Sequence, residues 1–178
     1  MNTDELRALQ SPLKDRYRQM PEAALVTLRA SGYLGENVTC KIETGKALVA
    51  ACLHPATGGT GMSACSGDML LEALVACAGV TLNAVATALG IELRDARLQA
   101  EGDLDFRGTL GVTKDVPVGF QDIRLEIVLD SDASEEELAT LLRLTERYCV
   151  VYQTLLQPPK MTVTRRMVED SAAAGASG

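Results

Sequence analysis

The most reactive side chains of this 178-residue chain belong to its cysteines and its single histidine. A cysteine thiolate is a nucleophile and a metal ligand, whereas a buried thiol behaves as a small hydrophobic residue. Metal binding, redox chemistry and simple burial are therefore the competing interpretations. The residues concerned are Cys40, Cys52, His54, Cys65, Cys77 and Cys149.

Cys52, His54 and Cys65 could on paper supply three ligands to a zinc ion. The chain contains no CxxC pair, however, and the spacing matches no common zinc pattern. His54 precedes Pro55 in a segment rich in glycine, which favours an incidental surface histidine over a catalytic one. The segment GGTG at 58–61 lacks the Lys-Ser/Thr ending of a phosphate-binding loop. We therefore expect no metal and no nucleotide cofactor.

The cysteines differ in their sequence surroundings. Cys40 and Cys52 lie in strand-like apolar segments, which favours burial in the core, and Cys65 lies in a loop. Cys77 and Cys149 lie in helical segments, ACAGVTL and YCVVYQTL, and each precedes a Thr-Leu pair. The spacing alone favours two buried core thiols, and it leaves open the alternative that Cys77 and Cys149 form a reactive pair.

Cys77 lies near the middle of the 21-residue segment 69–89, MLLEALVACAGVTLNAVATAL, which contains one charged residue and one amide. Its small or polar residues recur at helical spacing, beside a strongly apolar strip. Asp68 precedes the segment and Gly90 follows it, as is typical of the two ends of a helix. The small or polar strip is Glu72, Ala76, Gly79, Asn83 and Thr87, and the apolar strip is Leu71, Val75, Ala78, Leu82, Val85 and Leu89.

This segment is long enough to cross a bilayer, but no aromatic belt and no adjoining lysine or arginine flanks it. We therefore expect a fully buried helix and no membrane span. A 178-residue α+β protomer has difficulty covering a helix that is apolar on nearly every side. A partner chain would cover the second side, so the sequence predicts an intertwined homodimer.

The remaining segments predict an α+β fold. Strict apolar–polar alternation is typical of half-buried strands, and Ser134 with Glu137 forms a capping box that opens a second long helix. The spacing of its apolar residues places on one face Leu138, Leu141, Leu142, Tyr148 and Cys149. Pro158 and Pro159 end the helical region. The predicted strands are 23–34, 37–44, 46–53, 96–107, 122–130 and 160–167, mostly antiparallel, with a loop at 54–67.

The ends of the chain differ from its central part. Residues 1–20 form a polar helical arm that ends at Pro21, residues 21–168 form the domain, and the tail 169–178 is expected to be disordered. The first residues are charged and contain no apolar signal segment, so we expect a cytoplasmic protein with reduced cysteines. The net charge of −7 argues against nucleic acid as a partner.

Two segments together resemble the OsmC/Ohr family of osmotically inducible and organic hydroperoxide resistance proteins. They are SGDMLLEALVACAGVTLNAVATALGI and, some seventy residues later, LTERYCVVYQTL. The order of strands and helices extends the resemblance over about residues 22–166. The resemblance implies an intertwined α+β homodimer with both long helices at its centre.

The resemblance also implies roles for the two helical cysteines. Cys77 would be the peroxidatic thiol that attacks an organic hydroperoxide, and Cys149 the resolving thiol that forms a disulfide with it. A dithiol reductant of the lipoyl type would reopen that disulfide, and no cofactor would be needed. An arginine is expected to assist ionisation of Cys77, and Arg29 is a candidate for this role.

The chain differs from the hydroperoxide resistance branch at several positions. Gly67, with Asp68 beside it, stands where that branch has a glutamate, Ser66 stands in place of a proline, and Val150 replaces a proline after the second cysteine. The sequence thus indicates a divergent OsmC-like member. The first hypothesis is a thiol-dependent peroxidase. The alternative is a non-enzymatic OsmC-like stress protein that binds a small lipophilic molecule at the dimer interface.

Overall fold

Helices and strands are interspersed along the chain. The computed structural model describes residues 2–20, 31–34, 39–43, 48–112 and 114–166. The α+β class predicted from the sequence is confirmed. In chain order the elements are α1 (Thr3–Gln19), β1 (Ser31–Leu34), β2 (Thr39–Glu43), β3 (Leu48–Cys52), the 3₁₀ turn η2 (Pro55–Thr57), β4 (Ala64–Cys65), α2 (Ser66–Leu89), β5 (Asp95–Asp103), α3 (Phe106–Thr109), β6 (Asp122–Asp130), α4 (Glu135–Tyr148) and α5 (Val150–Leu156).

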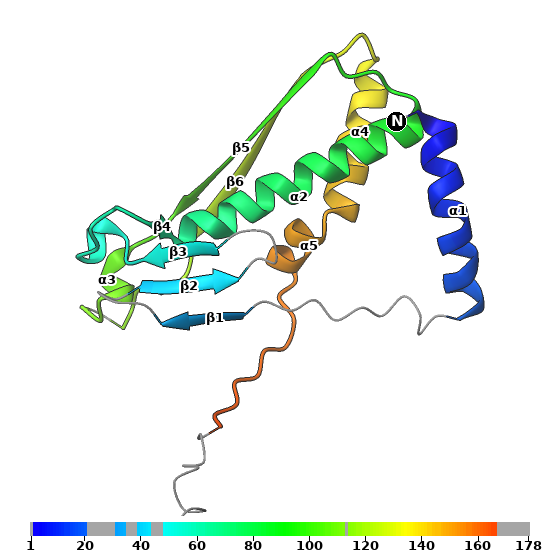
Figure 1. Cartoon of the computed structure of the whole chain (residues 1–178). Helices are drawn as coiled ribbons and strands as arrows, with labels where there is room; N and C mark the ends of the chain where they lie inside the picture. The colour runs from blue at the N-terminus through cyan, green and yellow to red at the C-terminus, as the bar shows by residue number, and fades with distance from the viewer. Residues whose placement is uncertain (1, 21–30, 35–38, 44–47, 113, 167–178) are drawn as a thin grey trace, which may run out of the picture.

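The strands form two separate sheets (Figure 1). In the first, β1, β2 and β3 pair antiparallel and β4 pairs parallel to β3. In the second, β5 and β6 pair antiparallel over their whole length. Exposed and half-buried residues alternate along β5 and β6, as expected when one face of a sheet is covered. The predicted antiparallel pairing is confirmed, although it is divided between two sheets.

Helix α2 is the longest element and lies between the β5–β6 pair and the C-terminal helices (Figure 1). It begins at Ser66, three residues before the predicted start, and ends at Leu89 as predicted. Gly90 adopts the left-handed conformation with φ 73°, and its N–H donates to the carbonyl oxygens of Ala86 and Thr87. Glycine reaches this conformation without strain, which explains why the helix stops there.

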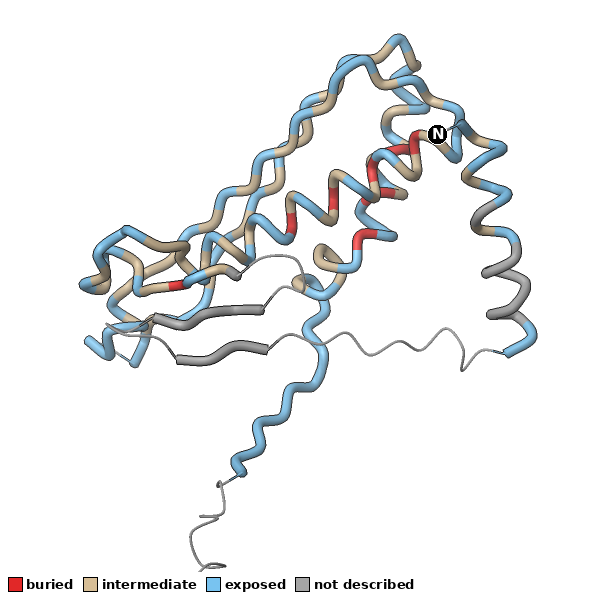
Figure 2. The backbone as a smooth tube through the Cα atoms, in the orientation of Figure 1, coloured by how far each residue is buried: buried red, intermediate tan, exposed pale blue. Residues whose placement is uncertain are grey.

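The buried face of α2 differs from the predicted apolar strip. Leu74, Ala78, Leu82 and Ala86 are buried, at a spacing of four residues, and Figure 2 shows them as a red line along the helix. Ala78 and Leu82 belong to the predicted strip, whereas Leu74 and Ala86 do not. Leu82 and Ala86 pack with Leu141 of α4 in the main hydrophobic cluster. The small side chains of the alanines therefore allow α4 to pack closely against this face of α2.

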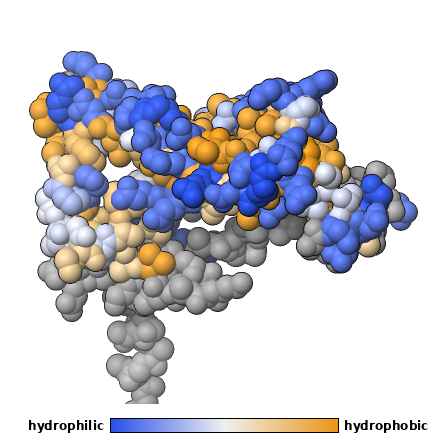
Figure 3. Space-filling model, turned by 90° about the horizontal axis from the view of Figure 1, so that it is seen from above, coloured by the Kyte–Doolittle hydropathy of each residue, from blue (hydrophilic) through white to orange (hydrophobic). Residues whose placement is uncertain are grey.

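Part of α2 is not covered by the described residues of this chain. Val80 is 74% exposed and Leu70 is 38% exposed, and burial of this part by a partner chain stays a prediction. Viewed from above, hydrophobic side chains lie open among hydrophilic ones (Figure 3). By length and composition α2 is the one helix of the described residues that could also cross a membrane, a property it shares with core helices of soluble proteins.

Helix α4 begins with the predicted capping box. The Ser134 hydroxyl accepts the N–H of Glu137, and the Glu137 carboxylate accepts the N–H of Ser134. Leu141 and Cys149 are buried, as their predicted face requires. Tyr148, the last residue of the helix, faces α2 across a cavity but is 59% exposed.

Two predicted strands differ in the structure. The strand expected at 96–107 ends at Asp103, and Asp105 caps the short helix α3 by accepting the N–H of Arg107. Phe106 therefore lies in a helix. The strand expected at 160–167 is absent over residues 160–166, where the chain is extended and exposed. No neighbouring strand of the described residues pairs with this segment, and unpaired backbone groups define no strand.

The other predicted segments are found where the structure describes them. The arm forms α1, and the hydroxyl of Thr3 donates to the carbonyl oxygen of Thr87 at the end of α2. The loop expected at 54–67 contains η2 and β4, and its last two residues belong to α2. Residues 23–30 of the first predicted strand and the tail 169–178 lie outside the described residues.

The buried Leu141 provides a test of the α2–α4 packing. Leu141→Ala removes a side chain that is 0% exposed and leaves a cavity, so it is expected to lower the free energy of unfolding by about 3 kcal/mol. Chemical denaturation followed by circular dichroism measures this change. Leu110→Ala, at a site that is 56% exposed, is the control and is expected to change it by less than about 1 kcal/mol. Equal effects of the two substitutions would contradict the packing described.

Candidate active site

Cys77 lies on α2 directly before the buried Ala78 and is itself only half buried. Its position places the thiol at the border between the covered and the open sides of the helix. Small molecules can therefore reach the sulfur of Cys77, while protein groups surround the rest of it.

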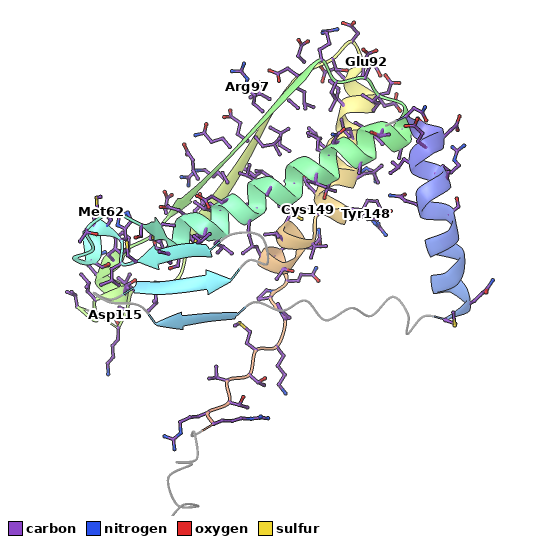
Figure 4. The ribbon with its side chains drawn as sticks, viewed as in Figure 1. Met62, Glu92, Arg97, Asp115, Tyr148 and Cys149 are labelled. Atoms are coloured by element: carbon purple, nitrogen blue, oxygen red, sulfur yellow. The ribbon has the colours of Figure 1, made fainter. Side chains whose placement is uncertain are left out.

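Cys149 lies between two helices rather than within one, which differs from the predicted helical position. It is both the C-cap residue of α4 and the N-cap residue of α5, with φ −72° and ψ 109° (Figure 4). One turn earlier, the hydroxyl of Thr145 donates to the carbonyl oxygen of Leu141, an arrangement that bends helices. The chain changes direction at Cys149, whose side chain is fully buried.

This change of direction points the first N–H groups of α5 toward α2. The first N–H groups of a helix have no partner within it, and no side chain caps α5. The N–H groups of Val150 and Val151 interact with the Cys77 sulfur, and the Cys149 thiol donates to it as well. The structure thus brings together Cys77 and Cys149, the two residues that the resemblance assigned to one site.

The surroundings of Cys77 favour its thiolate. Burial alone would raise the pKa of Cys77, but four donors oppose it and hold the pKa below its ordinary value. They are the N–H groups of Val151 and Val150, the thiol of Cys149 and the hydroxyl of Thr81. Thr81 follows Cys77 by one helical turn, so it faces the same side of α2.

The surroundings of Cys149 act in the opposite direction. Burial raises the pKa of Cys149, and the hydrogen bond to Cys77 together with the negative charge of the Cys77 thiolate raises it further. The N–H groups of Tyr152 and Val151 oppose these effects without reversing them. Of the two sulfurs, the half-buried one of Cys77 therefore ionises more readily than the buried one of Cys149.

The expected arginine is not found beside Cys77. The groups that set the pKa of Cys77 in the described part of the chain include no arginine or lysine, and Arg29 lies outside the described residues. Arg94 and Arg124 are paired with aspartates on the exposed side of the β5–β6 sheet. Asp68 lies in the first turn of α2, nine residues before Cys77 and about 13 Å away along the helix axis, so its carboxylate is too far away to act on that thiol.

The remaining reactive residues lie apart from this pair. Cys52 and Cys65 are half buried, and the side chain of Cys40 lies outside what the structure describes. His54 Nδ1 accepts the N–H of Ala56, and its ring stacks on Phe106 at 4.9 Å. Within the described ranges, no three histidine, cysteine or acidic side chains gather as a metal site would require.

Sequence reasoning missed the backbone donors of α5 and the role of Thr81. The signal for Thr81 was present in its spacing of four residues from Cys77. No sequence pattern marks the N–H groups of Val150 and Val151, because their position depends on the break at Cys149.

A cavity of about 500 Å³ lies between α1, α2 and α4, and neither Cys77 nor Cys149 belongs to its lining. Thr81, which donates to Cys77, also contributes to its wall, so the cavity adjoins the reactive sulfur. Most of its lining is apolar and suits a hydrocarbon group. The lining includes Val80, Thr81, Val85, Leu89, Leu144 and Tyr148.

Solved structures with the same arrangement of helices and strands define the class of protein. An OsmC-like protein from Mycoplasma pneumoniae is 20% identical, with a TM-score of 0.64 over 75% of this chain and 89% of that chain. An organic hydroperoxide resistance protein OsmC from Legionella pneumophila is 20% identical, with a TM-score of 0.58 over 74% and 90%. An organic hydroperoxide resistance protein from Elizabethkingia anophelis is 18% identical, with a TM-score of 0.60 over 76% and 91%. The chain therefore has the OsmC-like fold.

The family model described as "OsmC-like protein" matches residues 59–164, which is more than half of the chain. The chain belongs to the OsmC-like family, as the two sequence segments predicted. No curated protein sequence matches it.

The lowered pKa of Cys77 predicts how its alkylation depends on pH. Iodoacetamide reacts with the thiolate, so in native protein Cys77 is expected to reach half its maximal rate at a lower pH than in unfolded protein. Thr81→Val removes one donor and is expected to shift this midpoint to higher pH. Mass spectrometry of the peptide that contains Cys77 measures the rate. Thr154→Val, at an exposed site on α5, is the control and should leave the midpoint unchanged. An unshifted midpoint in Thr81→Val would remove Thr81 from the site.

Proposed function

We propose that this chain is a thiol-dependent peroxidase that reduces organic hydroperoxides. The observation that carries the proposal is the proximity of Cys77 and Cys149, which influence each other so that the pKa of the first is lowered and that of the second is raised. Two core thiols in an apolar environment would both have raised pKa values, because burial disfavours the thiolate. The names of the structural relatives from Legionella pneumophila and Elizabethkingia anophelis agree with this chemistry.

The first step breaks the O–O bond. The Cys77 thiolate attacks the terminal oxygen of the hydroperoxide, the alkoxide leaves, and a proton converts it to the alcohol. Cys77 becomes a sulfenic acid and has gained the oxygen that the substrate lost.

The second step uses the buried thiol. Once Cys77 is a sulfenic acid, the negative charge that raised the pKa of Cys149 is gone, so Cys149 ionises more readily. Its sulfur attacks the Cys77 sulfur, a disulfide forms and water leaves. A dithiol of the lipoyl type would reopen the disulfide by exchange. The arrangement thus delays ionisation of the resolving thiol until the first step is complete.

The open side of α2 supports a homodimer as the working form. Val80 is 74% exposed, Tyr148 59% and Val150 69%, and Val80 and Tyr148 line the same apolar cavity. A second copy of the chain on this surface would exclude water from the reacting sulfurs. That cover would also deepen the apolar cavity beside Thr81.

The apolar cavity also supports the alternative, a non-enzymatic protein that binds a lipophilic molecule. Its volume of about 500 Å³ suits a small hydrocarbon ligand in either case. The pair of opposite pKa shifts favours the peroxidase, since a binding protein has no need for an activated thiol.

A single treatment with an organic hydroperoxide tests the enzymatic function. One equivalent of cumene hydroperoxide, added to reduced protein, is expected to join Cys77 and Cys149 within seconds. Cleavage after methionine with cyanogen bromide leaves both cysteines in the fragment 70–161. With the disulfide formed, the mass of this fragment is lower by two hydrogens than that of the reduced fragment. Cys77→Ser is expected to lower turnover at least 1,000-fold, because it removes the nucleophile.

Two further variants complete this test. Cys149→Ser is expected to stop after one turnover with a sulfenic acid at Cys77, which dimedone traps. The double variant Cys52→Ser/Cys65→Ser is the control and should turn over normally, because both residues lie far from Cys77. Unmodified Cys77 and Cys149 after several minutes would favour the binding protein instead.

The dimer is tested at the exposed Val80. Val80→Asp places a charge in the apolar surface and is expected to weaken dimerisation at least 100-fold, because the charge would have to leave water at the interface. Sedimentation velocity over a range of concentrations measures the change. Val112→Asp, at a site that is 69% exposed beyond α3, is the control. A monomeric wild-type chain at all concentrations would contradict the dimer.

A further inference from the structure

Two cysteines outside the candidate active site occupy neighbouring strands. Cys52 ends β3, Cys65 ends β4, and the two residues are direct partners in this parallel pair. Neighbouring strands lie about 4.8 Å apart, and residues in register on parallel strands point to the same face. Disulfides require a Cα separation of about 4.4–6.8 Å, so the backbone here already meets that condition. Both thiols are free and half buried, so solutes can reach them.

The loop between these cysteines holds its two ends in place. The carbonyl oxygen of His54 accepts the N–H groups of Thr57 and Gly59, and the hydroxyl of Thr57 donates to it as well. A Cβ atom at Gly59 would lie only 1.6 Å from the carbonyl oxygen of Leu53, so only glycine allows this close return of the chain. The start of the loop is therefore folded back on the end of β3, and β3 and β4 are already in register without a bond between the cysteines.

The side chains are oriented so that little movement would join them. The Cys52 sulfur lies 3.4 Å from the carbonyl oxygen of Ser63, in the segment that leads into β4. The Cys65 sulfur lies 3.7 Å from the position of a Cβ atom at Gly67, where the side chains of Phe120 and Leu104 also approach. Rotation about χ1 of the two residues changes the positions of both sulfurs without moving the backbone.

A metal site is a poorer explanation for this pair. A zinc ion needs three or four ligands, and His54 is the nearest further ligand along the chain. Its Nδ1 already accepts the N–H of Ala56, and its ring is held against Phe106. The described residues supply no third ligand to the two cysteines.

This pair is also separate from the proposed active site. Cys65 precedes Cys77 by twelve residues of α2, which corresponds to about 18 Å along the helix axis. Figure 4 shows Met62, in the loop between the paired cysteines, at one end of the molecule and Cys149 near its middle. Direct exchange between the two pairs within one chain is therefore excluded by distance.

We propose that Cys52 and Cys65 form a second redox site, a dithiol that closes to a disulfide between strands when it meets a small-molecule disulfide. One thiolate of the pair attacks the small disulfide, forms a mixed disulfide and releases one thiol. The other thiolate attacks the protein sulfur of that mixed disulfide and releases the second thiol. The protein loses two electrons and two protons, and the small disulfide gains them.

The bond would link the edge of the sheet to the start of the long helix. Cys65 is the residue that caps the N-terminus of α2, and Gly67 in the first turn packs against Phe120 and Leu104. Oxidation would therefore join the N-terminal end of α2 to β3 by a covalent bond, in addition to the pairing of β4 with β3.

Cyanogen bromide mapping of the full-length protein tests this site. The protein is equilibrated in mixtures of oxidised and reduced glutathione, quenched with acid and cleaved after methionine. Cys40 and Cys52 then lie in fragment 21–62, Cys65 alone lies in 63–69, and Cys77 and Cys149 lie in 70–161. The expected result is a covalent link between 21–62 and 63–69 in native protein, reversed by a dithiol.

Variants identify the partner of Cys65. Cys52→Ser is expected to abolish the link, whereas Cys40→Ser, in the same fragment, is the matched control and should retain it. Cys65→Ser should abolish it as well, and provides a second test if Cys52→Ser does not fold. The proposal would be overturned if the link formed only in denaturant, persisted in Cys52→Ser, or was absent at every glutathione ratio. Because Cys77 and Cys149 remain in a different fragment, failure of this site is distinguishable from failure of the peroxidase.

Discussion

Close contact between α2 and the C-terminal helices is the constraint on which the rest of the structure depends. It is possible because alanines alternate with leucines along the buried face of α2, so that Leu141 and Cys149 can approach the helix backbone. A larger residue at Ala78 or Ala86 would keep α4 away. Without that approach, two sulfurs separated by 72 positions in the sequence would not share a hydrogen bond. The chemistry of the site is thus a consequence of helix packing.

The activation of Cys77 relies on dipoles rather than on a positively charged side chain among the described residues. Backbone N–H groups at the start of α5 and one hydroxyl stabilise the thiolate. Such donors are fixed by the fold, so they need no flexible side chain to be ordered before reaction. The departures from the hydroperoxide resistance branch around Gly67 and Val150 therefore do not by themselves remove the means of lowering the pKa of Cys77.

Local patterns were sufficient to predict most of the elements. The alternation in 122–130, the capping box at Ser134 and the glycine after Leu89 each correspond to an element boundary or face in the structure. The break at Cys149 was not predictable, because the segment 135–156 is uniformly helical in composition and its bend depends on burial. The strand predicted at 160–166 is absent for a related reason. Alternation of apolar and polar residues shows that a segment could pair as a strand, but it does not show whether a neighbouring strand is present. The contact of Cys77 with Cys149 came only from the family resemblance, since spacing carries no information on contacts between distant helices.

The position of both sulfurs at the start of α5 affects the ease with which a bond between them is broken. The N–H groups of Val150 and Val151 stabilise a negatively charged sulfur, and they gain much less from a neutral disulfide. In the proposed peroxidase cycle the reduced pair would therefore be favoured relative to the disulfide, which would raise the reduction potential of the couple. A mild electron donor would then suffice to regenerate the two thiols.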